Sequence, residues 1–304
     1  MTFSDLITTF ANNILPIFLI SGTAYLVGKY FALDSRTVGR LVFYFFGPVL
    51  IFSLITKSQL PFNEMLKTAG FATAVMLSCA LIAFLGGLAL RLDRRTLISV
   101  ILVSMFANNG NFGLPLVSFA FGPSALAHSS IYFITSAVLT NSIGVLIASL
   151  GHTNIKRALL GLLKVPLIYA LILALIVIRF NLTLPIPIDR SVNLVASAAV
   201  PMMLVLLGLE LQKVQWSHNL RGLSLGAGVR LLAGPAVGLL MASLMGITGA
   251  AKQGGVLESS MPSAVMNTVL ANEYSLDSSL VTGTILVTTL LSPLTLTPLI
   301  LFLK

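Results

Sequence analysis

Two polar segments inside apolar stretches contain the residues of this chain best suited to bind a ligand. The first, Ala107-Asn108-Asn109-Gly110-Asn111-Phe112-Gly113-Leu114-Pro115-Leu116, interrupts an apolar run from Leu97 to Phe121. The second is Glu258-Ser259-Ser260-Met261-Pro262-Ser263-Ala264. Asparagine, glycine and proline at these spacings predict that two helices are broken. A broken helix offers a carbonyl end, which suits a cation, and an N–H end, which suits an anion.

The composition around these segments indicates an all-α integral membrane protein. Of the 304 residues, 57% are hydrophobic and only 9% are charged, whereas a soluble domain has about 25% charged residues. In lipid, non-helical backbone is stable only where protein or a water-filled cavity surrounds it. The two breaks are therefore expected to line a cavity, as they do in many secondary transporters. The net charge of +9 is assigned to segment ends that meet lipid headgroups, and no nucleic-acid partner is expected.

Ten stretches have the roughly 20 mostly apolar residues that a spanning helix requires. They lie near residues 10–30, 38–56, 67–90, 97–121, 127–150, 165–180, 192–211, 222–246, 254–272 and 281–303. Lys and Arg are concentrated in the odd-numbered loops. This distribution places those loops in the cytoplasm and both termini outside. The compact loops fit a bacterial inner membrane, with the termini in the periplasm.

The two halves of the chain have corresponding features. Pro48 and Pro201 lie within the second and seventh predicted spans and are 153 residues apart (201 − 48 = 153). Asn109 and Pro262, in the two breaks, have the same separation (262 − 109 = 153). The sequence therefore predicts two five-helix repeats. Because five is odd, the second repeat enters the membrane from the opposite side, as in inverted-repeat transporters.

The predicted repeats comprise residues 1–150 and 165–304, and a cytoplasmic connector over 151–164 joins them. Two interpretations of the connector remain open. It is either a short basic helix on the membrane surface or a plain loop.

Three segments of the chain, taken in order, resemble the auxin efflux carrier family, the bacterial relatives of the plant PIN proteins. They are Asn108 to Leu116, Val229 to Val237, and Glu258 to Asn267 followed by Ala271-Asn272-Glu273-Tyr274. The resemblance covers essentially the whole chain. It implies that the fourth and ninth helices cross at their breaks, and that a mobile bundle moves by an elevator mechanism against a scaffold that also forms a homodimer. It implies organic acid anions, such as auxin, malate or malonate, as substrates.

The chain also resembles the bile/arsenite/riboflavin transporter-like superfamily, and the resemblance implies a fold like that of the bile acid sodium symporters and of NhaA. The symporters have a glutamate just before the second break, and Glu258 matches it. Plant carriers have Asn-Pro-Asn at the start of the sixth helix, where this chain reads Lys164-Val165-Pro166-Leu167. This departure argues against auxin itself as the substrate.

The substrate site is expected at the two breaks. Asn108 is the first candidate, and the alternative for the asparagines is that they cap the half-helices. The glycines and prolines are expected to shape the backbone, and the N–H groups of Ser263 and Ala264 are expected to face an anion. The predicted substrate-binding residues are Asn108, Asn109, Gly110, Asn111, Pro115, Met261, Pro262, Ser263 and Asn267.

Glu258 is expected to couple transport to an ion, because an ionisable residue at this depth is a functional candidate. The ion is either a proton or Na⁺, with oxygen ligands from Asn109, Ser129 and Thr135. The alternative places Glu258 at the outer mouth of its helix, solvated or paired with Lys252. No other cofactor is expected, and the scattered histidines predict no metal site.

Three further residues, Arg230, Pro48 and Pro201, are assigned gating or structural roles. Arg230 lies within a span, where it attracts anions, pairs with a carboxylate or extends to the interface. No zinc-protease or nucleophile-elbow motif is present, so an enzyme is not expected. Three hypotheses remain: an organic-anion transporter, a sodium-coupled symporter of the bile acid type, and an anion sensor.

Overall fold

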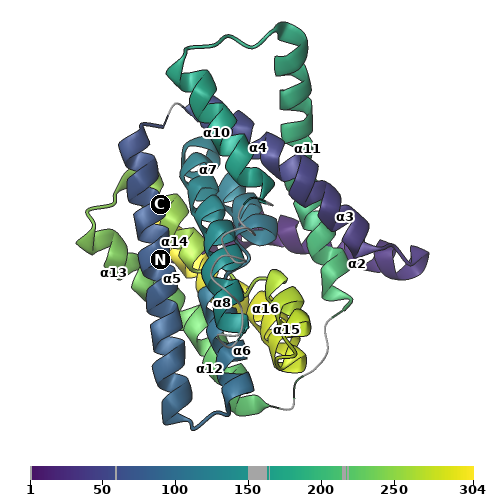
Figure 1. Cartoon of the computed structure of the whole chain (residues 1–304), viewed down its shortest axis with the longest axis vertical. Coiled ribbons are helices and arrows are strands. Elements are labelled where there is room, and N and C mark those ends of the chain that lie inside the picture. The colour runs from purple at the N-terminus through teal and green to yellow at the C-terminus, as the bar shows by residue number, and fades with distance from the viewer. Residues whose placement is uncertain (1, 59, 150–162, 164, 214–216, 218) are drawn as a thin grey trace.

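A computed structural model describes residues 2–58, 60–149, 163, 165–213, 217 and 219–304. Over these residues the chain is helical and forms no named β-strand (Figure 1). The predicted connector, apart from Leu163, lies outside the described residues. The helices, with π-helical turns labelled η, are α1 (Phe3–Thr9), η1 (Phe10–Ile14), α2 (Leu15–Phe31), α3 (Ser35–Leu41), η2 (Val42–Phe46), α4 (Gly47–Ser58), α5 (Phe62–Ala89), α6 (Arg94–Met105), η3 (Asn109–Gly113), α7 (Leu114–Leu139), η4 (Thr140–Gly144), α8 (Val145–Ala148), α10 (Pro166–Arg179), α11 (Ile186–Leu211), α12 (Leu220–Gly228), η5 (Val229–Ala233), α13 (Gly234–Leu244), α14 (Gly249–Ser259), α15 (Met266–Glu273) and α16 (Ser278–Leu303).

Seven helical stretches in the described part of the chain are long and apolar enough to cross a membrane. The prediction of an all-α membrane protein is therefore confirmed. The seven stretches are Phe3–Phe31, Ser35–Ser58, Phe62–Ala89, Asn109–Ala148, Ile186–Leu211, Leu220–Leu244 and Ser278–Leu303.

The other predicted spans coincide with helices that are short or interrupted. Residues 165–180 correspond to α10, which is apolar but has only 14 residues. Residues 254–272 comprise α14 and α15 with a non-helical interval between them. Residues 97–121 comprise α6, a second interval, and the helix that continues into α7. Gly122, with φ of +75° and Pro123 after it, kinks α7 between the fourth and fifth predicted spans.

The helices form two groups (Figure 1). Helices α2, α3, α4, α10 and α11 pack with one another. Helices α5, α6 and α7 pack with α12, α13, α14 and α16. The groups meet where α4 and α11 contact α7 and where α11 contacts η3. Helices that lie early in each half of the sequence therefore form one group, and helices that lie later form the other.

Helix α6 lies at the centre of the second group. Its residues from Ile98 to Met105 are all buried, as expected for a helix that other helices surround on every side. Asp93 fixes where α6 begins, because its carboxylate accepts hydrogen bonds from the N–H groups of Arg95 and Thr96. The side-chain hydrogen bond from Thr96 lowers the pKa of Asp93.

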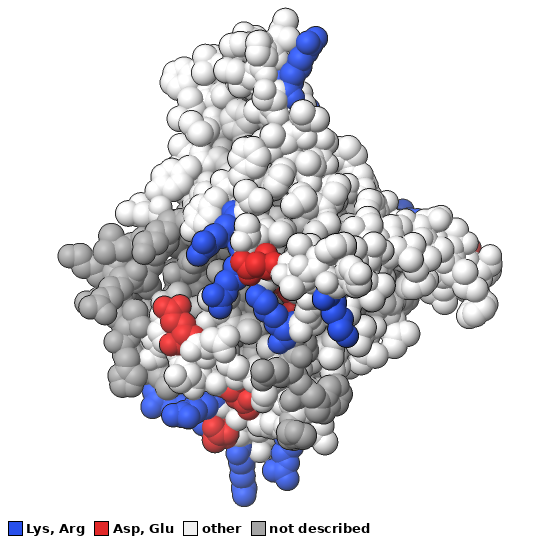
Figure 2. Space-filling model, turned by 90° about the vertical axis from the view of Figure 1, so that its right-hand side faces the viewer, with Lys and Arg blue, Asp and Glu red and all other residues white. Residues whose placement is uncertain are grey.

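The outer surface is mostly apolar. Figure 2 shows one face on which basic side chains lie toward the lower end and across the middle, while the upper part carries little charge. Large apolar side chains such as Leu19, Leu26, Leu194 and Leu294 are each at least 60% exposed. Apolar surface of this extent would be unusual on a soluble protein and suits contact with lipid.

Close packing between α2 and α11 depends on Gly208. A Cβ at this position would lie 2.1 Å from the carbonyl oxygen of Ser21 and 2.9 Å from the Cβ of Ala24. Small residues allow such close approach of membrane helices. Gly208→Ala is therefore expected to destabilise the protein by about 1–3 kcal/mol, measured by thermal unfolding in detergent.

Gly228→Ala is the matched control, because a Cβ there would meet no atom within 4 Å. Alanine favours helix over glycine, so this variant is expected to be at least as stable as the wild type. Equal melting temperatures for the two variants would contradict the close approach of α2 and α11.

Candidate functional site

Two short non-helical intervals, each overlapping one of the polar segments singled out in the sequence, lie side by side. Residues 106–108, between α6 and η3, and residues 260–265, between α14 and α15, are non-helical; we call them the paired breaks. Ala107 and Ser263 form an antiparallel bridge. The N–H of Asn108 donates to the carbonyl oxygen of Pro262 at 2.7 Å, and the N–H of Ala264 donates to that of Phe106 at 3.0 Å. Each break thereby satisfies backbone groups of the other, as irregular backbone within a membrane requires.

Glycines allow the surrounding elements to reach the paired breaks. A Cβ on Gly113 would lie 2.3 Å from Oε2 of Glu258, and a Cβ on Gly110 would lie 2.8 Å from the ring of Phe133. Pro115 is the second residue of α7, but α7 continues η3 directly, and the N–H groups of Gly113 and Leu114 already donate to the carbonyl oxygens of Asn108 and Asn109. Pro115 therefore lies beyond the first turn of this helical stretch, whereas the positions of Gly110 and Gly113 are consistent with their predicted backbone roles.

Glu258 is fully buried at the end of α14. The Nδ2 of Asn109 donates to Oε2 of Glu258 at 2.7 Å and to the carbonyl oxygen of Glu258 at 2.9 Å. The alternative that placed Glu258 in solvent is wrong, because Glu258 is fully buried. The alternative that paired it with Lys252 is also wrong, because the Nζ of Lys252 lies over the ring of Phe302, 5.8 Å from its centroid. A buried carboxylate must be neutralised or paired, so Glu258 suits the binding of a proton or a metal cation.

Several buried polar atoms around Glu258 and the paired breaks have no hydrogen-bond partner among the described residues. They are Ser104 Oγ, Asn108 Nδ2, Asn109 Oδ1, Ser129 Oγ, Glu258 Oε1 and Asn267 Oδ1. Each such atom costs about 1–3 kcal/mol of desolvation. Unsatisfied groups gathered in one place are expected at a site that a ligand, an ion or water completes.

The unpartnered atoms include both kinds of group that the sequence predicts. Asn108 contributes a donor, which suits an anion. Asn109, Ser129 and Glu258 contribute oxygens, which suit a cation. A Cβ on Gly254, one turn before Glu258, would lie 2.7 Å from Ser129 Oγ, so Ser129 packs on the same part of α14. Thr135 differs, because its hydroxyl donates to the carbonyl oxygen of Ile131 within α7 at 2.8 Å.

The N–H groups of the second break that precede the N-terminus of α15 are already hydrogen bonded. The N–H of Ser263 donates to Thr288 Oγ1 at 3.1 Å, and that of Ala264 is used by Phe106. The Nδ2 of Asn267 donates to the carbonyl oxygen of Phe106 and to Ser263 Oγ, both at 3.1 Å. An anion that contacts the two N–H groups would therefore have to replace existing bonds.

Arg230 lies in η5 and is only 2% exposed. Its guanidinium donates to the carbonyl oxygens of Ser104 at 2.8 Å, Ser259 at 2.6 Å and Met261 at 3.0 and 3.2 Å. The alternative that Arg230 extends to the membrane interface is wrong, because the side chain is buried. Arg230 instead joins the carbonyl ends of α6 and α14.

The remaining predicted residues lie farther apart. Pro48 is the second residue of α4, and Pro201 lies in the interior of α11; both belong to the group of helices around α2. Asn111, in η3, is half-buried, and its side chain interacts with the carboxyl group of Glu210 in α11. Sequence reasoning missed Glu210. Its position within the predicted span 192–211 is a signal that could have identified it.

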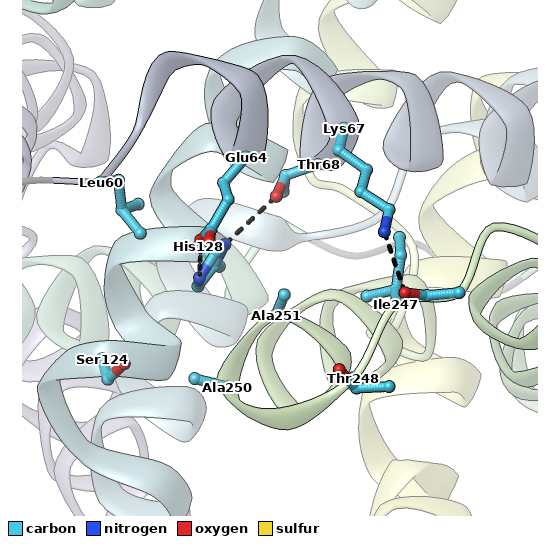
Figure 3. A pocket seen from close by; sticks show the side chains of 11 residues that line it. Leu60, Glu64, Lys67, Thr68, Ser124, His128, Ile247, Thr248, Ala250 and Ala251 are labelled. Carbon is cyan, nitrogen blue, oxygen red and sulfur yellow. Dashed lines mark hydrogen bonds and ion pairs between the residues drawn. The ribbon is translucent and has the colours of Figure 1, made fainter.

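A separate pocket of about 350 Å³ lies at the start of α5 and α14 (Figure 3). His128 faces Glu64 at 3.6 Å and Thr68 Oγ1 at 3.2 Å, and Lys67 donates to the carbonyl oxygen of Gly246 at 2.9 Å. None of the unpartnered polar atoms found in the described residues lines this pocket. The paired breaks are therefore the stronger candidate site.

Comparisons with known proteins identify the family of this chain. The family described as "Membrane transport protein" matches residues 9–156 and 152–300. An uncharacterized transporter of Methanocaldococcus jannaschii is 29% identical over 266 residues, which cover 85% of this chain and 86% of that protein. A "Putative malonate transporter" of Rhizobium meliloti is 24% identical over 301 residues, covering 94% and 93%. A "Probable auxin efflux carrier component 3b" of Oryza sativa is 28% identical over 111 residues, covering 35% and 18%. The chain belongs to the membrane transport protein family that includes the auxin efflux carriers, and it is an integral membrane transporter.

Proposed function

We propose that this transporter carries small organic acid anions, with malonate as the first substrate to test, and binds them at the paired breaks. The observation that carries the proposal is the buried, unpartnered Nδ2 of Asn108 in a non-helical segment of a membrane protein. A carboxylate oxygen would satisfy this donor. The relative described as a malonate transporter supports a dicarboxylate as the substrate class.

We propose further that the ten predicted spans form two inverted repeats, residues 1–150 and 165–304, whose broken helices cross at the paired breaks. Support comes from the equivalent places of the two breaks, each shortly before the last long helix of its half. The two groups of helices suggest an elevator mechanism. The group that contains α6 and α14 would carry the site, while the group around α2 and α11 would be the scaffold and the homodimer interface.

Glu258, Asn109 and Ser129 are proposed to hold the coupling ion, a proton or Na⁺. An inside-negative potential favours exit of an anion by about 2.3 kcal/mol per charge per 100 mV. Uptake would therefore require a coupled cation, whereas export would not. The sodium-coupled alternative has the unpartnered oxygens of these three residues in its favour. We also propose that the protein lies in a bacterial inner membrane, with both termini in the periplasm.

The test is flux of labelled malonate, malate and indole-3-acetate into proteoliposomes under imposed proton, sodium and potential gradients. Asn108→Ala is expected to reduce malonate transport about 10- to 100-fold, the effect of losing about 1.4–2.8 kcal/mol of binding. Its stability is expected to stay within about 1 kcal/mol of wild type, because the amide nitrogen removed makes no protein hydrogen bond.

Two outcomes would count against the proposal. Wild-type flux with unchanged Asn108→Ala flux would place the anion elsewhere. Detectable anion binding without flux under any gradient would indicate a sensor.

A further inference from the structure

We infer that Arg230 is a built-in cation, occupying a cation site formed by the carbonyl groups of Ser104, Ser259 and Met261. The fixed positive charge would then take the place of a dissociable alkali cation at the paired breaks. This inference rests on the proposed function only for its consequence for anion binding. The site itself follows from the contacts of Arg230.

Two of the three carbonyl groups belong to helix ends, and the third lies just beyond one of them. Ser104 lies in the last turn of α6, Ser259 is the last residue of α14, and Met261 lies two residues after Ser259 in the non-helical interval. The last four carbonyl groups of a helix lack helical partners, and the helix dipole makes this end favourable for a cation. Two such ends meet at one point inside the protein. Without a cation there, three buried acceptors would remain unsatisfied.

The guanidinium group fits this site by shape as well as charge. It donates from Nε, Nη1 and Nη2, which together make four hydrogen bonds to the three carbonyl groups. A planar group with five fixed donors can contact acceptors in several directions at once. Among the described residues, no carboxylate forms a salt bridge with Arg230. The helix ends are therefore its direct partners.

The local backbone of Arg230 is adapted to this contact. Arg230 lies in the π-helical turn η5, a type of turn that occurs frequently at functional sites. Gly234, one turn later, lets η5 approach α14: a Cβ there would lie 2.6 Å from the carbonyl oxygen of Ser259 and 3.4 Å from Nη2 of Arg230. The sequence thus provides both the cation and the space for it.

This assignment has a consequence for ion coupling. The carbonyl groups around Arg230 are not free to bind Na⁺, so the oxygens of Glu258, Asn109 and Ser129 form the remaining place for a coupling cation. An anion at the paired breaks would experience the charge of Arg230 whether or not a coupling ion is bound. Removing the side chain would expose a vacant site for a small cation.

The test is chemical rescue of Arg230→Ala by added guanidinium. The readout is the melting temperature in detergent, measured at constant ionic strength. Arg230→Ala is expected to have a lower melting temperature than wild type and to regain part of the loss in tens of millimolar guanidinium. Tetramethylammonium, which has no N–H donors, should not restore it. Wild type and Arg36→Ala, which removes an exposed arginine, should respond equally to the two salts.

Sodium provides a second comparison. A rise in the melting temperature of the wild type on addition of Na⁺ would report on the site at Glu258. A larger rise in Arg230→Ala would report on Na⁺ bound by the vacated carbonyl groups. If Arg230→Ala does not fold, two other variants are measured in its place: Arg230→Lys and Gly234→Ala. The Cβ added in Gly234→Ala would push on the carbonyl oxygen of Ser259, which accepts a hydrogen bond from Arg230. Both are expected to be less stable than wild type, and Arg230→Lys should retain more anion binding than Arg230→Gln.

The inference is overturned if a folded Arg230→Ala protein melts at the wild-type temperature, or if guanidinium and tetramethylammonium affect it equally. If Gly234→Ala and Arg230→Lys are measured instead, melting temperatures equal to that of the wild type would likewise overturn the inference. Because the thermal measurements contain no substrate, they remain decisive even if malonate proves not to be transported. Failure of malonate flux in wild type would instead count against the proposed function.

Discussion

Glu258→Gln is expected to abolish gradient-driven accumulation of the anion while leaving anion exchange in place. Glutamine has the shape of glutamate, and its carbonyl oxygen can still accept the hydrogen bond that Asn109 Nδ2 donates to Oε2. It cannot take up a proton, and it binds a metal cation less well than a carboxylate does. The variant would therefore imitate the ion-loaded, neutral state at all times. Binding and reorientation would continue, but the gradient would no longer drive them.

The measurement compares two assays on the same proteoliposomes. Counterflow, in which labelled malonate enters against an excess of unlabelled malonate inside, should stay within a few fold of wild type. Uptake driven by a proton or sodium gradient should fall at least about tenfold, since a loss of even 1.4 kcal/mol of coupling gives that factor. Glu273→Gln, at an exposed position at the end of α15, is the matched control. Gradient-driven uptake that survives in Glu258→Gln would show that Glu258 does not couple transport.

Local features of the sequence explain which parts of the fold could be predicted. Asparagine, glycine and proline disfavour a continuous helix, and the non-helical residues 106–108 and 260–265 each overlap one of the two segments that the sequence singles out. Most of the first segment, from Asn109 to Leu116, is nevertheless helical, in η3 and the start of α7. The depth of Glu258 was an open question, because hydropathy alone does not determine whether a carboxylate beside a break faces solvent or the interior. Glu258 is fully buried, and its hydrogen bond comes from Asn109, a residue 149 positions away in the sequence.

The role of Arg230 lies beyond what a local pattern contains. Its partners, Ser104 and Met261, accept through carbonyl oxygens that every residue possesses, so their side chains give no signal. The pairing requires two helix ends and a π-helical turn to meet, which only the packing of distant segments determines. Glu210 is a different case, because its type and its place in a predicted span were visible. The absence of a neighbouring break concealed it.

Asn109→Ala, directly after the first of the paired breaks, is expected to be clearly destabilising, although Asn108→Ala next to it is not. The Nδ2 of Asn109 makes two hydrogen bonds to Glu258, one to its carboxylate and one to its carbonyl oxygen. Removing the amide leaves a fully buried carboxylate without a described donor. An unsatisfied buried group costs about 1–3 kcal/mol, and more when it is charged.

The comparison of the two asparagines separates structural support from ligand contact. Thermal unfolding in detergent should show a clear decrease in melting temperature for Asn109→Ala and little change for Asn108→Ala, whose Nδ2 has no partner to lose. Transport should show losses in both. The loss in Asn108→Ala would come from a missing contact to the anion, and that in Asn109→Ala from a displaced Glu258. If the two variants were equally stable, the hydrogen bonds of Asn109 would not hold Glu258 in place, and the proposed ion site would lose its geometric basis.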